Sequence, residues 1–368
     1  ISFCVYGFEI YLTYKLEPDT IFEIYEKYKN ENLNFFPHSR QRVFNTSNNF
    51  GFKNEVFTLG GISKTNLIMT NENGFYPISR HDEYGWANID PDYDNFDIAL
   101  IGDSYVEGYS VNQKDTIVEY LKSRNFNAIS FAFAGNNPLH MYATYVEYVE
   151  IFKPKKIFWF HTDNHLHELE LDKENKYLIR YLINNNFNQN LILRQNEIDN
   201  LMKNHSLKMW KERKKTRSRK NNYLRMLKLG EIRENLGLYY KKKEVKNKNC
   251  FKNKYNFNVS NETIQLYNKI LSNLKDRTNK INAKIYFVYL PSKSVFNECS
   301  LIKENRFTVN DDNLNKIKKQ IISNDIIFLD IKNKIENEIN DYEQIYSTHF
   351  NSKGYAFISD KIIDLLSE

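Results

Sequence analysis

The residues with the clearest chemical character form a short segment, Gly102-Asp103-Ser104, directly after an apolar run that ends at Ile101. A serine in the turn between a buried strand and a helix can present its hydroxyl as a nucleophile. Its backbone N–H also joins the free amides at the start of the helix, which can stabilise an oxyanion. We therefore predict a nucleophile at Ser104. The alternative is a helix N-cap, in which the Ser104 hydroxyl accepts a backbone hydrogen bond.

Three later turns carry residues that fit the same chemistry. Gly135 follows the next apolar run and could donate its N–H to the oxyanion, although a plain strand-to-helix turn would also use a glycine. Asn164 follows the third run and could donate its side-chain amide. His349 precedes the last helix, and an imidazole has a pKa near neutrality, as a general base for Ser104 requires. We predict Ser104 and His349 as catalytic residues, with Ser104, Gly135 and Asn164 as oxyanion donors.

A metal site is the alternative interpretation of the residues around Asn164, where four metal-ligating residue types gather: His161, Asp163, His165 and His167. Some of these have the i, i+4 spacing that places two side chains on one helix face. Zinc would need a better-defined set of ligands. We predict neither a metal nor an organic cofactor.

The elements that must position these turns alternate between strand and helix. Apolar runs typical of buried parallel strands occupy residues 97–102, 127–134, 156–161, 284–290 and 326–331. Helical patterns occupy residues 114–124, 139–152, 262–279, 314–322 and 353–366. This alternation predicts an α/β fold, with a mostly parallel sheet covered by helices on both faces.

Two segments lie outside the alternation. Residues 17–95 hold turn signals and short strand-like runs after a helical pattern at 20–29, and we predict an amino-terminal extension. Residues 166–258 are helical in pattern with almost no strand signal, and we predict a helical insertion. The main domain then spans residues 96–368, interrupted by that insertion.

Positive charge is concentrated in the insertion. Residues 203–254 contain 19 Lys and Arg and 4 Asp and Glu, a net charge of +15, whereas the whole chain carries +6. The rest of the chain is therefore net negative, which argues against a uniformly basic nucleic-acid-binding protein. The basic segment is either a solvated helix face or a contact for an anionic polysaccharide or anionic lipid headgroups. We predict no nucleic-acid partner, and the oligomeric state stays open.

Composition excludes several classes of protein. The 368 residues include 26 Phe and 26 Tyr but only 3 Cys, which rules out a disulfide-stapled miniprotein and a largely disordered chain. No run of about 18 apolar residues supports a multi-span membrane protein. Cys250 and Cys299 could pair in an exported protein, but we favour free buried thiols.

The amino end, residues 1–12, is mostly apolar but too short to span a bilayer. We interpret residues 1–16 either as the remnant of a signal anchor or as a helix that packs on the domain. The first interpretation predicts an exported protein tethered to a membrane, in a bacterial periplasm or cell envelope. A cytoplasmic location remains open.

The four segments together resemble the SGNH hydrolases, the GDSL esterase and lipase superfamily. The resemblance covers about residues 97–165 and 284–366 and implies a three-layer α/β/α sandwich with a flavodoxin-like sheet. It matches Ser104 to the nucleophile, Gly135 and Asn164 to the oxyanion residues, and His349 to the base. Residues 349–355, His-Phe-Asn-Ser-Lys-Gly-Tyr, are similar to the family's usual ending.

Two departures from the family pattern affect the predicted site. The third segment reads Thr-Asp-Asn-His instead of Gly-x-Asn-Asp, which weakens the match of Asn164. Tyr346 stands three residues before His349, where the family has the aspartate that orients the histidine. A nearby acid could replace that aspartate, from the set Asp330, Asp341 and Glu343, or a backbone carbonyl could hold the ring.

These observations leave three functional hypotheses. The first is a serine ester hydrolase that removes small O-acyl groups, with a carbohydrate as the expected substrate, through an acyl-enzyme on Ser104. The second is an O-acetyltransferase acting on a surface polysaccharide. The third is a catalytically weak or inactive binding domain, because Tyr346 replaces the expected acid and the third segment is altered around Asn164.

Overall fold

The structure, a computed structural model, describes residues 2–16, 21–31, 34–38, 56–229, 232–233, 259–296 and 311–367. Cys250 and Cys299 lie outside the described residues, so their predicted alternatives are not tested, whereas Cys4 is a free, exposed thiol. Most of the basic segment beyond residue 229 also lies outside them.

Five parallel strands form the central sheet: β4 (Ile98–Ile101), β5 (Ala128–Ser130), β6 (Lys156–Thr162), β7 (Lys284–Leu290) and β8 (Ile327–Asp330). Their order across the sheet is β5-β4-β6-β7-β8. In chain order this is 2-1-3-4-5, the flavodoxin-like arrangement, and the topology changes direction beside β4. The predicted α/β fold class is confirmed.

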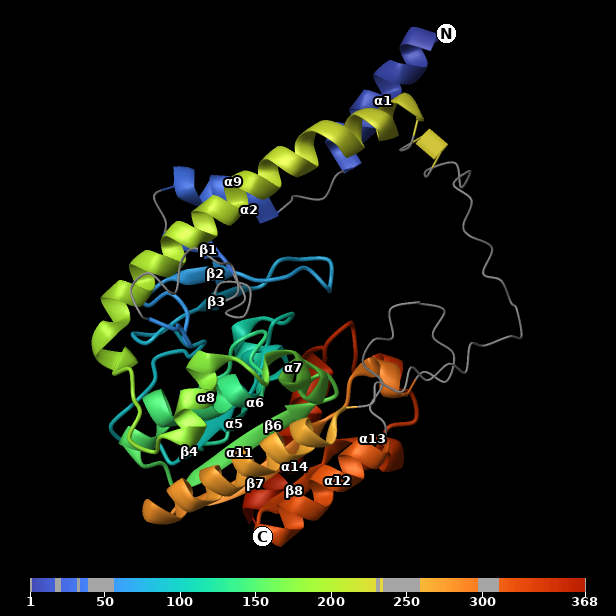
Figure 1. The fold of residues 1–368 in the computed structure, drawn as a ribbon. Helices are drawn as coiled ribbons and strands as arrows, with labels where there is room; N and C mark the ends of the chain where they lie inside the picture. Colours follow the sequence, from blue (N-terminus) through green and yellow to red (C-terminus); the bar gives the residue numbers. More distant parts are fainter. Residues whose placement is uncertain are drawn as a thin grey trace.

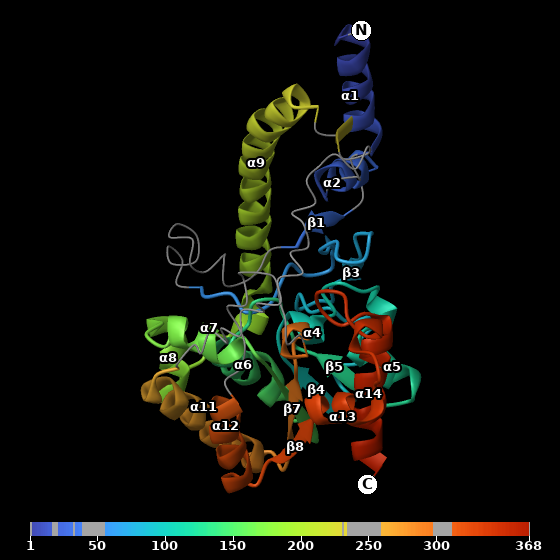
Figure 2. The ribbon, with the colours of Figure 1, turned by 90° about the vertical axis from the view of Figure 1, so that its right-hand side faces the viewer.

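Helices cover both faces of this sheet (Figures 1 and 2). Alternate strand residues face opposite sides, so that Ile101 and Trp159 enter one core while Leu100 and Phe160 enter the other. The first face is covered by α6 (Pro138–Thr144), α7 (His165–Asp172), α8 (Lys176–Ile183), α11 (Asn261–Lys280) and α12 (Asp311–Ser323). The second is covered by α4 (Ser104–Glu107), α5 (Ile117–Ser123), α13 (Ile331–Glu338) and α14 (Ser352–Ser367).

Short helical turns complete the domain. A π-helical turn, η2 (Tyr145–Val149), continues α6, and the others are 3₁₀ turns: η1 (Gln113–Asp115), η3 (Glu150–Phe152), η4 (Leu191–Arg194), η5 (Lys293–Val295) and η6 (Tyr342–Gln344).

The amino-terminal extension forms a second, three-stranded sheet, with β1 (Phe35–Pro37), β2 (Asn66–Ile68) and β3 (Ile78–Arg80) in that order. The pair β1 and β2 is parallel, and β2 and β3 are antiparallel. The sheet is tied to the main domain because Gln113 accepts the N–H of Arg80 and donates to its carbonyl, both at 2.8 Å. The extension is therefore part of the domain surface and not a separate body.

A long helix, α9 (Gln195–Leu227), leaves the domain and meets α1 (Ser2–Leu16) near its far end, with α2 (Ile21–Asn30) close to β1 (Figure 1). The segment predicted as an insertion is thus divided. Its helices α7 and α8 pack against α6 and α11 in the core layer, and only α9 departs from it. Within the described ranges, no helix has the length and apolar character needed to cross a membrane.

Candidate active site

Ser104 and His349 meet at the carboxyl edge of the central sheet. Ser104 is the first residue of α4, directly after β4, and His349 lies in the turn before α14. The Ser104 Oγ lies 3.0 Å from Nε2 of His349. The His349 side chain is 13% exposed, so solvent reaches this pair.

A carboxylate from the amino-terminal extension completes the arrangement. Glu72 lies in the loop between β2 and β3, and its Oε1 and Oε2 are 2.9 and 3.0 Å from Nδ1 of His349. The backbone N–H of His349 also donates to Glu72 Oε2, at 3.0 Å. A carboxylate only accepts hydrogen bonds, so Nδ1 carries the imidazole proton and Nε2 presents its lone pair to Ser104. The site is a Ser-His-Glu triad in geometry.

Sequence reasoning missed Glu72 and proposed three acids that are engaged elsewhere. Asp330 pairs with Lys318 at 2.8 Å, Glu343 pairs with Lys293, and Asp341 caps the turn at η6. Tyr346, at the family's aspartate position, is buried and donates its hydroxyl to the Pro291 carbonyl at 2.7 Å.

No motif marks Glu72 in the sequence. It stands 277 residues before His349, in a segment outside the resemblance, and the one local signal is the turn at Asn73-Gly74. That turn predicts a loop but does not predict which residue the loop presents.

The N-cap of α4 is Asp103 and not Ser104. Asp103 accepts the N–H of Tyr105 at 3.0 Å, which leaves the Ser104 hydroxyl to His349. Burial alone would raise the pKa of Asp103, but the adjacent His165 ring, the Tyr105 N–H and the nearby His349 hold that pKa below its ordinary value. Asp103 therefore stays ionised behind the nucleophile, with His165 Nε2 at 3.2 Å from its Oδ2.

Gly135 lies in a tight turn after β5. The N–H of Asn136 donates to the carbonyl of Phe133 at 3.1 Å, and Gly135 occupies the third position with φ of 88°. A type II turn requires a positive φ there, which glycine adopts without strain. Among the described residues the Gly135 N–H has no acceptor in the protein, so it is available to a ligand. The oxyanion role of Gly135 remains a prediction.

Asn164 begins the turn into α7, directly after β6. The Thr162 hydroxyl lies within hydrogen-bonding distance of Asn164 Oδ1 and also 3.1 Å from Asp103 Oδ2. This contact ties the loop of Asn164 to the residue that precedes Ser104. The Asn164 Nδ2 has no acceptor within the described part of the chain, and its oxyanion role also remains a prediction.

Two of the histidines near Asn164, His161 and His165, make contacts within the protein core. His161 is fully buried, its Nδ1 lies 3.0 Å from the Tyr267 hydroxyl, and burial holds its pKa well below the ordinary value. His165 faces Asp103. In the part of the chain that the structure covers, no three His, Cys, Asp or Glu residues are placed to hold a metal ion.

The sequence matches no profile of a known protein family and none of the curated proteins. Several solved structures show some similarity to this chain. One, from Desulfitobacterium hafniense and assigned to the G-D-S-L family of lipolytic proteins, has a TM-score of 0.39 at 10% identity, over 73% of this chain and 98% of its own. The esterase EstA from Pseudoalteromonas sp. has a TM-score of 0.36 at 10% identity, over 73% and 96%. An acetyl xylan esterase has 0.35 at 12% identity, over 73% and 98%.

In the order of its strands and of its site residues, the chain resembles the SGNH hydrolases. The TM-scores are below 0.5, so the assignment of a function depends on the geometry of this chain's own residues. This chain departs from the SGNH pattern in the carboxylate that contacts His349. That carboxylate is Glu72, from the extension, and not a residue close to His349 in the sequence.

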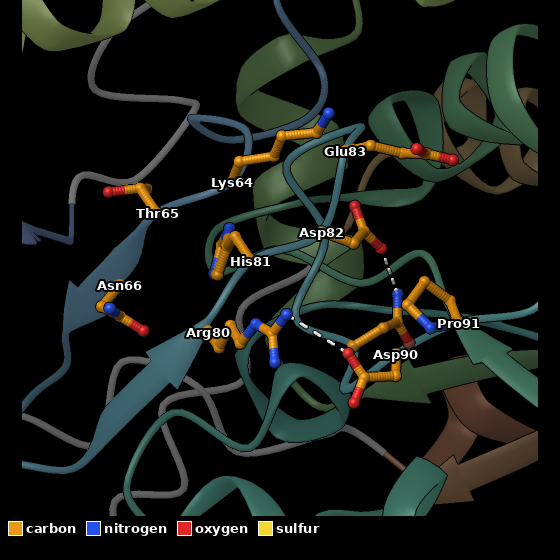
Figure 3. Close-up of a pocket in the computed structure, with 10 residues that line it drawn as sticks. Lys64, Thr65, Asn66, Arg80, His81, Asp82, Glu83, Asp90 and Pro91 are labelled. Atoms are coloured by element: carbon orange, nitrogen blue, oxygen red, sulfur yellow. Dashed lines mark hydrogen bonds and ion pairs between the residues drawn. The ribbon is translucent and has the colours of Figure 1, made fainter. Parts of the chain in front are cut away.

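A cavity of about 610 Å³ opens beside the three-stranded sheet, away from the triad. Figure 3 shows its charged lining: Lys64, Arg80, Asp82, Glu83 and Asp90. None of Ser104, His349 and Glu72 lines it. Its wall includes His81, whose Nε2 lies 3.9 Å from the buried carboxylate of Glu107, the last residue of α4.

Proposed function

We propose that the protein is a serine ester hydrolase that removes small O-acyl groups from a carbohydrate. The observation that carries the proposal is the continuous contact from Ser104 Oγ to His349 Nε2, at 3.0 Å, and from His349 Nδ1 to Glu72, at 2.9 Å. This is the arrangement in which a histidine removes the proton from a serine hydroxyl while a carboxylate holds its tautomer.

Acylation begins when the Ser104 oxygen attacks the acyl carbonyl carbon and its proton passes to His349 Nε2. Glu72 stabilises the imidazolium through Nδ1. The free N–H of Gly135 and the Nδ2 of Asn164 are the donors for the oxyanion, together with the Ser104 N–H. His349 then gives its proton to the departing alcohol oxygen, and the acyl group remains on Ser104.

Deacylation repeats these steps with water. A water molecule loses a proton to His349 Nε2 and attacks the acyl carbon. The Ser104 oxygen leaves and regains a proton from His349, and a carboxylic acid is released. The acyl size and the carbohydrate alcohol are supported by the SGNH resemblance of residues 97–165 and 284–366. The position of Glu72 removes one motive for the inactive-domain hypothesis, the absence of an acid at Tyr346, whereas the altered third segment around Asn164 remains.

A fluorophosphonate probe tests the proposal because it modifies only an activated serine. We expect a single adduct on Ser104, lost in Ser104→Ala and in His349→Ala, together with release of acetate from an aryl acetate. Ser130→Ala is the matched control, since the Ser130 hydroxyl in β5 is buried and has no hydrogen-bond partner among the described residues. A folded protein whose Ser104 stays unlabelled would overturn the proposal. Acetyl transfer to an added glycan, in preference to water, would support the transferase version.

We also propose that α1 holds the protein at an anionic membrane surface. The polarity of this helix is inverted: Glu9 is fully buried, whereas Tyr6, Phe8 and Tyr11 are 39, 54 and 49% exposed. Glu9 accepts the N–H of Ile232 at 2.8 Å. Apolar side chains directed outward fit a lipid surface. In the sequence, residues 203–254 carry a net charge of +15, the sign that anionic headgroups attract.

Sedimentation with lipid vesicles tests this placement. We expect the full chain to bind vesicles that contain phosphatidylglycerol and to bind pure phosphatidylcholine vesicles less well. The double variant Phe8→Glu, Tyr11→Glu should lose binding. Leu193→Glu, at an 85% exposed residue of η4, should retain it. Equal binding by both variants would contradict the proposal.

A further inference from the structure

We propose that Glu107 is a positioning residue for the oxyanion hole, acting through the turn that carries Gly135. The inference rests on the proposed hydrolase function and deepens it, since it identifies what holds one oxyanion donor in place. Among the described residues, the Glu107 side chain makes no hydrogen bond or ion pair with Ser104, His349 or Glu72. It is the last residue of α4, three residues after Ser104, and its side chain is fully buried.

The two oxygens of Glu107 join two parts of the structure. Oε2 accepts the N–H of Ala134 at 2.8 Å. Ala134 is the second residue, and Gly135 the third, of the four-residue turn 133–136. Oε1 lies 2.9 Å from Nε2 of His38, in the extension. The carboxylate therefore connects the helix of the nucleophile directly to the peptide unit before the predicted oxyanion donor.

His38 supports the same turn a second time. Its ring stacks on Phe133, the first residue of the turn, with centroids 4.8 Å apart and an interplanar angle of 24°. The ring thus contacts both the carboxylate and the turn that the carboxylate binds. Phe133 also contacts the segment that precedes Ser104, because its N–H donates to the Gly102 carbonyl at 3.4 Å.

His81 lies near the carboxylate but is directed elsewhere. Its Nδ1 donates to the Gly85 carbonyl at 2.8 Å, and its Nε2 is 3.9 Å from Glu107 Oε1, too far for a hydrogen bond. Burial lowers the pKa of His81 to about 4, despite the opposing effect of Glu107, so the ring is neutral near pH 7. The specific donors to Glu107 are therefore His38 and Ala134.

A buried carboxylate is expensive to maintain, because desolvation of an ion in a protein interior costs several kcal/mol unless its partners compensate. Placement of an oxyanion donor requires a geometry held to about 0.5 Å, which hydrogen bonds to one buried side chain can supply. The Ala134 N–H and the His38 ring are the partners of Glu107, and they hold the turn of Gly135 against the helix of Ser104.

Two substitutions separate the hydrogen bond from the charge. Glu107→Gln keeps an oxygen that accepts the Ala134 N–H, whereas Glu107→Ala removes the acceptor. We expect Glu107→Gln to retain kcat within about threefold, and Glu107→Ala to lower kcat by about 100-fold with KM nearly unchanged, as loss of one oxyanion donor does. Ester hydrolysis is measured alongside the inhibition constant of a trifluoromethyl ketone, whose hemiketal oxyanion occupies the same hole.

Glu147 supplies the matched control. It is another buried carboxylate, and it accepts the backbone N–H of Leu191 at 3.0 Å and the hydroxyl of Tyr181 at 2.5 Å, far from the triad in the η2 turn. Glu147→Ala should lower the unfolding temperature as Glu107→Ala does. It should leave kcat per folded molecule and the inhibition constant within about twofold, as expected for a substitution outside the active site.

The proposal predicts that the inhibition constant of the ketone rises in step with the fall in kcat for Glu107→Ala alone. It is overturned if Glu107→Ala behaves like Glu147→Ala, or if kcat falls while ketone affinity is kept. Failure of the hydrolase proposal is distinguishable, because the unmodified protein would then show no Ser104-dependent hydrolysis and no ketone binding.

Discussion

At the level of single residues, the contact between Glu72 and His349 decides how the site works. Both carboxylate oxygens face Nδ1 of His349, and one of them also accepts the backbone N–H of the same residue. The imidazole is thereby fixed in the tautomer whose Nε2 accepts the proton of Ser104. In the SGNH pattern an aspartate three residues before the histidine makes this contact, and in this chain Glu72 makes it from a different part of the sequence.

We expect Glu72→Gln to lower kcat by about 10³- to 10⁴-fold, because an amide no longer enforces the tautomer or stabilises the imidazolium. The unfolding temperature should change little, since Glu72 is at the surface edge of the site with an 11% exposed side chain. Steady-state hydrolysis of an aryl acetate and a thermal melt measure the two effects.

Glu343→Gln is the control for this substitution, because Glu343 pairs with Lys293 and not with His349. It should keep kcat within about twofold, as expected for loss of an exposed ion pair. Equal kcat in Glu72→Gln and in the unmodified protein would show that His349 acts without this acid.

At the level of elements, the flavodoxin-like strand order explains why Ser104 and Asn164 lie close together. They follow β4 and β6, which are neighbours in the sheet, and the carboxyl ends of parallel strands share one edge. Glu72 needs a further element, the loop between β2 and β3. The Asn73 side chain anchors that loop, because its amide donates to the Ser110 carbonyl at 2.8 Å. Ser110 stands two residues after Gly108, the C-cap of α4.

We expect Asn73→Ala to lower kcat by about tenfold, less than the loss in Glu72→Gln, because the loop keeps Glu72 but holds it less firmly. KM and the unfolding temperature should stay near their original values, since Asn73 is exposed. The measurement is kcat at saturating ester. Asn95→Ala, at another exposed asparagine that bonds Asp92, should leave kcat unchanged, and an equal loss there would contradict the anchoring role.

At the level of the whole molecule, one buried acid links stability to pH. Asp163, at the end of β6, accepts hydrogen bonds from Tyr289 at 2.5 Å and from the N–H of Ser292 at 2.7 Å. Burial is the largest influence and raises its pKa from 3.8 to about 6, although these hydrogen bonds oppose it. The folded state therefore binds this proton more tightly than the unfolded state does.

Between about pH 4 and pH 6 the folded protein holds more protons at Asp163 than the unfolded chain, so this residue's contribution to stability falls as pH rises through that interval. Above about pH 6 the contribution is constant. Asp163→Asn has no such proton. The stability of Asp163→Asn relative to the unmodified protein should therefore rise by about 2 to 3 kcal/mol from pH 4 to pH 7.

Denaturant unfolding at pH 4, 5, 6 and 7 measures this difference for Asp163→Asn. Asp97→Asn is the comparison, because the Asp97 side chain is 48% exposed and pairs with Lys155 at the surface. Its relative stability should show no increase over the same interval. If the free energy of unfolding of Asp163→Asn changed with pH in parallel with that of the unmodified protein, the raised pKa of Asp163 would be contradicted.

The main domain and the predicted nucleophile and base were accessible from the sequence because they depend on local patterns. Apolar runs of strand length alternate with amphipathic helices, and each pattern reports the faces that an element must bury. Ser104 and His349 stand in the turns that such elements leave at the edge of a sheet, and the structure places them in contact. The resemblance to the SGNH hydrolases supplied the pairing of these two turns.

The tertiary structure alone decided the contacts between residues that are distant in the sequence. Glu72 reaches His349, and His38 reaches Glu107, only because the extension folds onto the carboxyl edge of the main sheet. Likewise, α7 and α8 join the core because their apolar faces match α6 and α11, although the chain pattern there resembles an insertion. Local patterns report what a segment buries. They do not report which other segment will cover it, since that depends on packing among all of them.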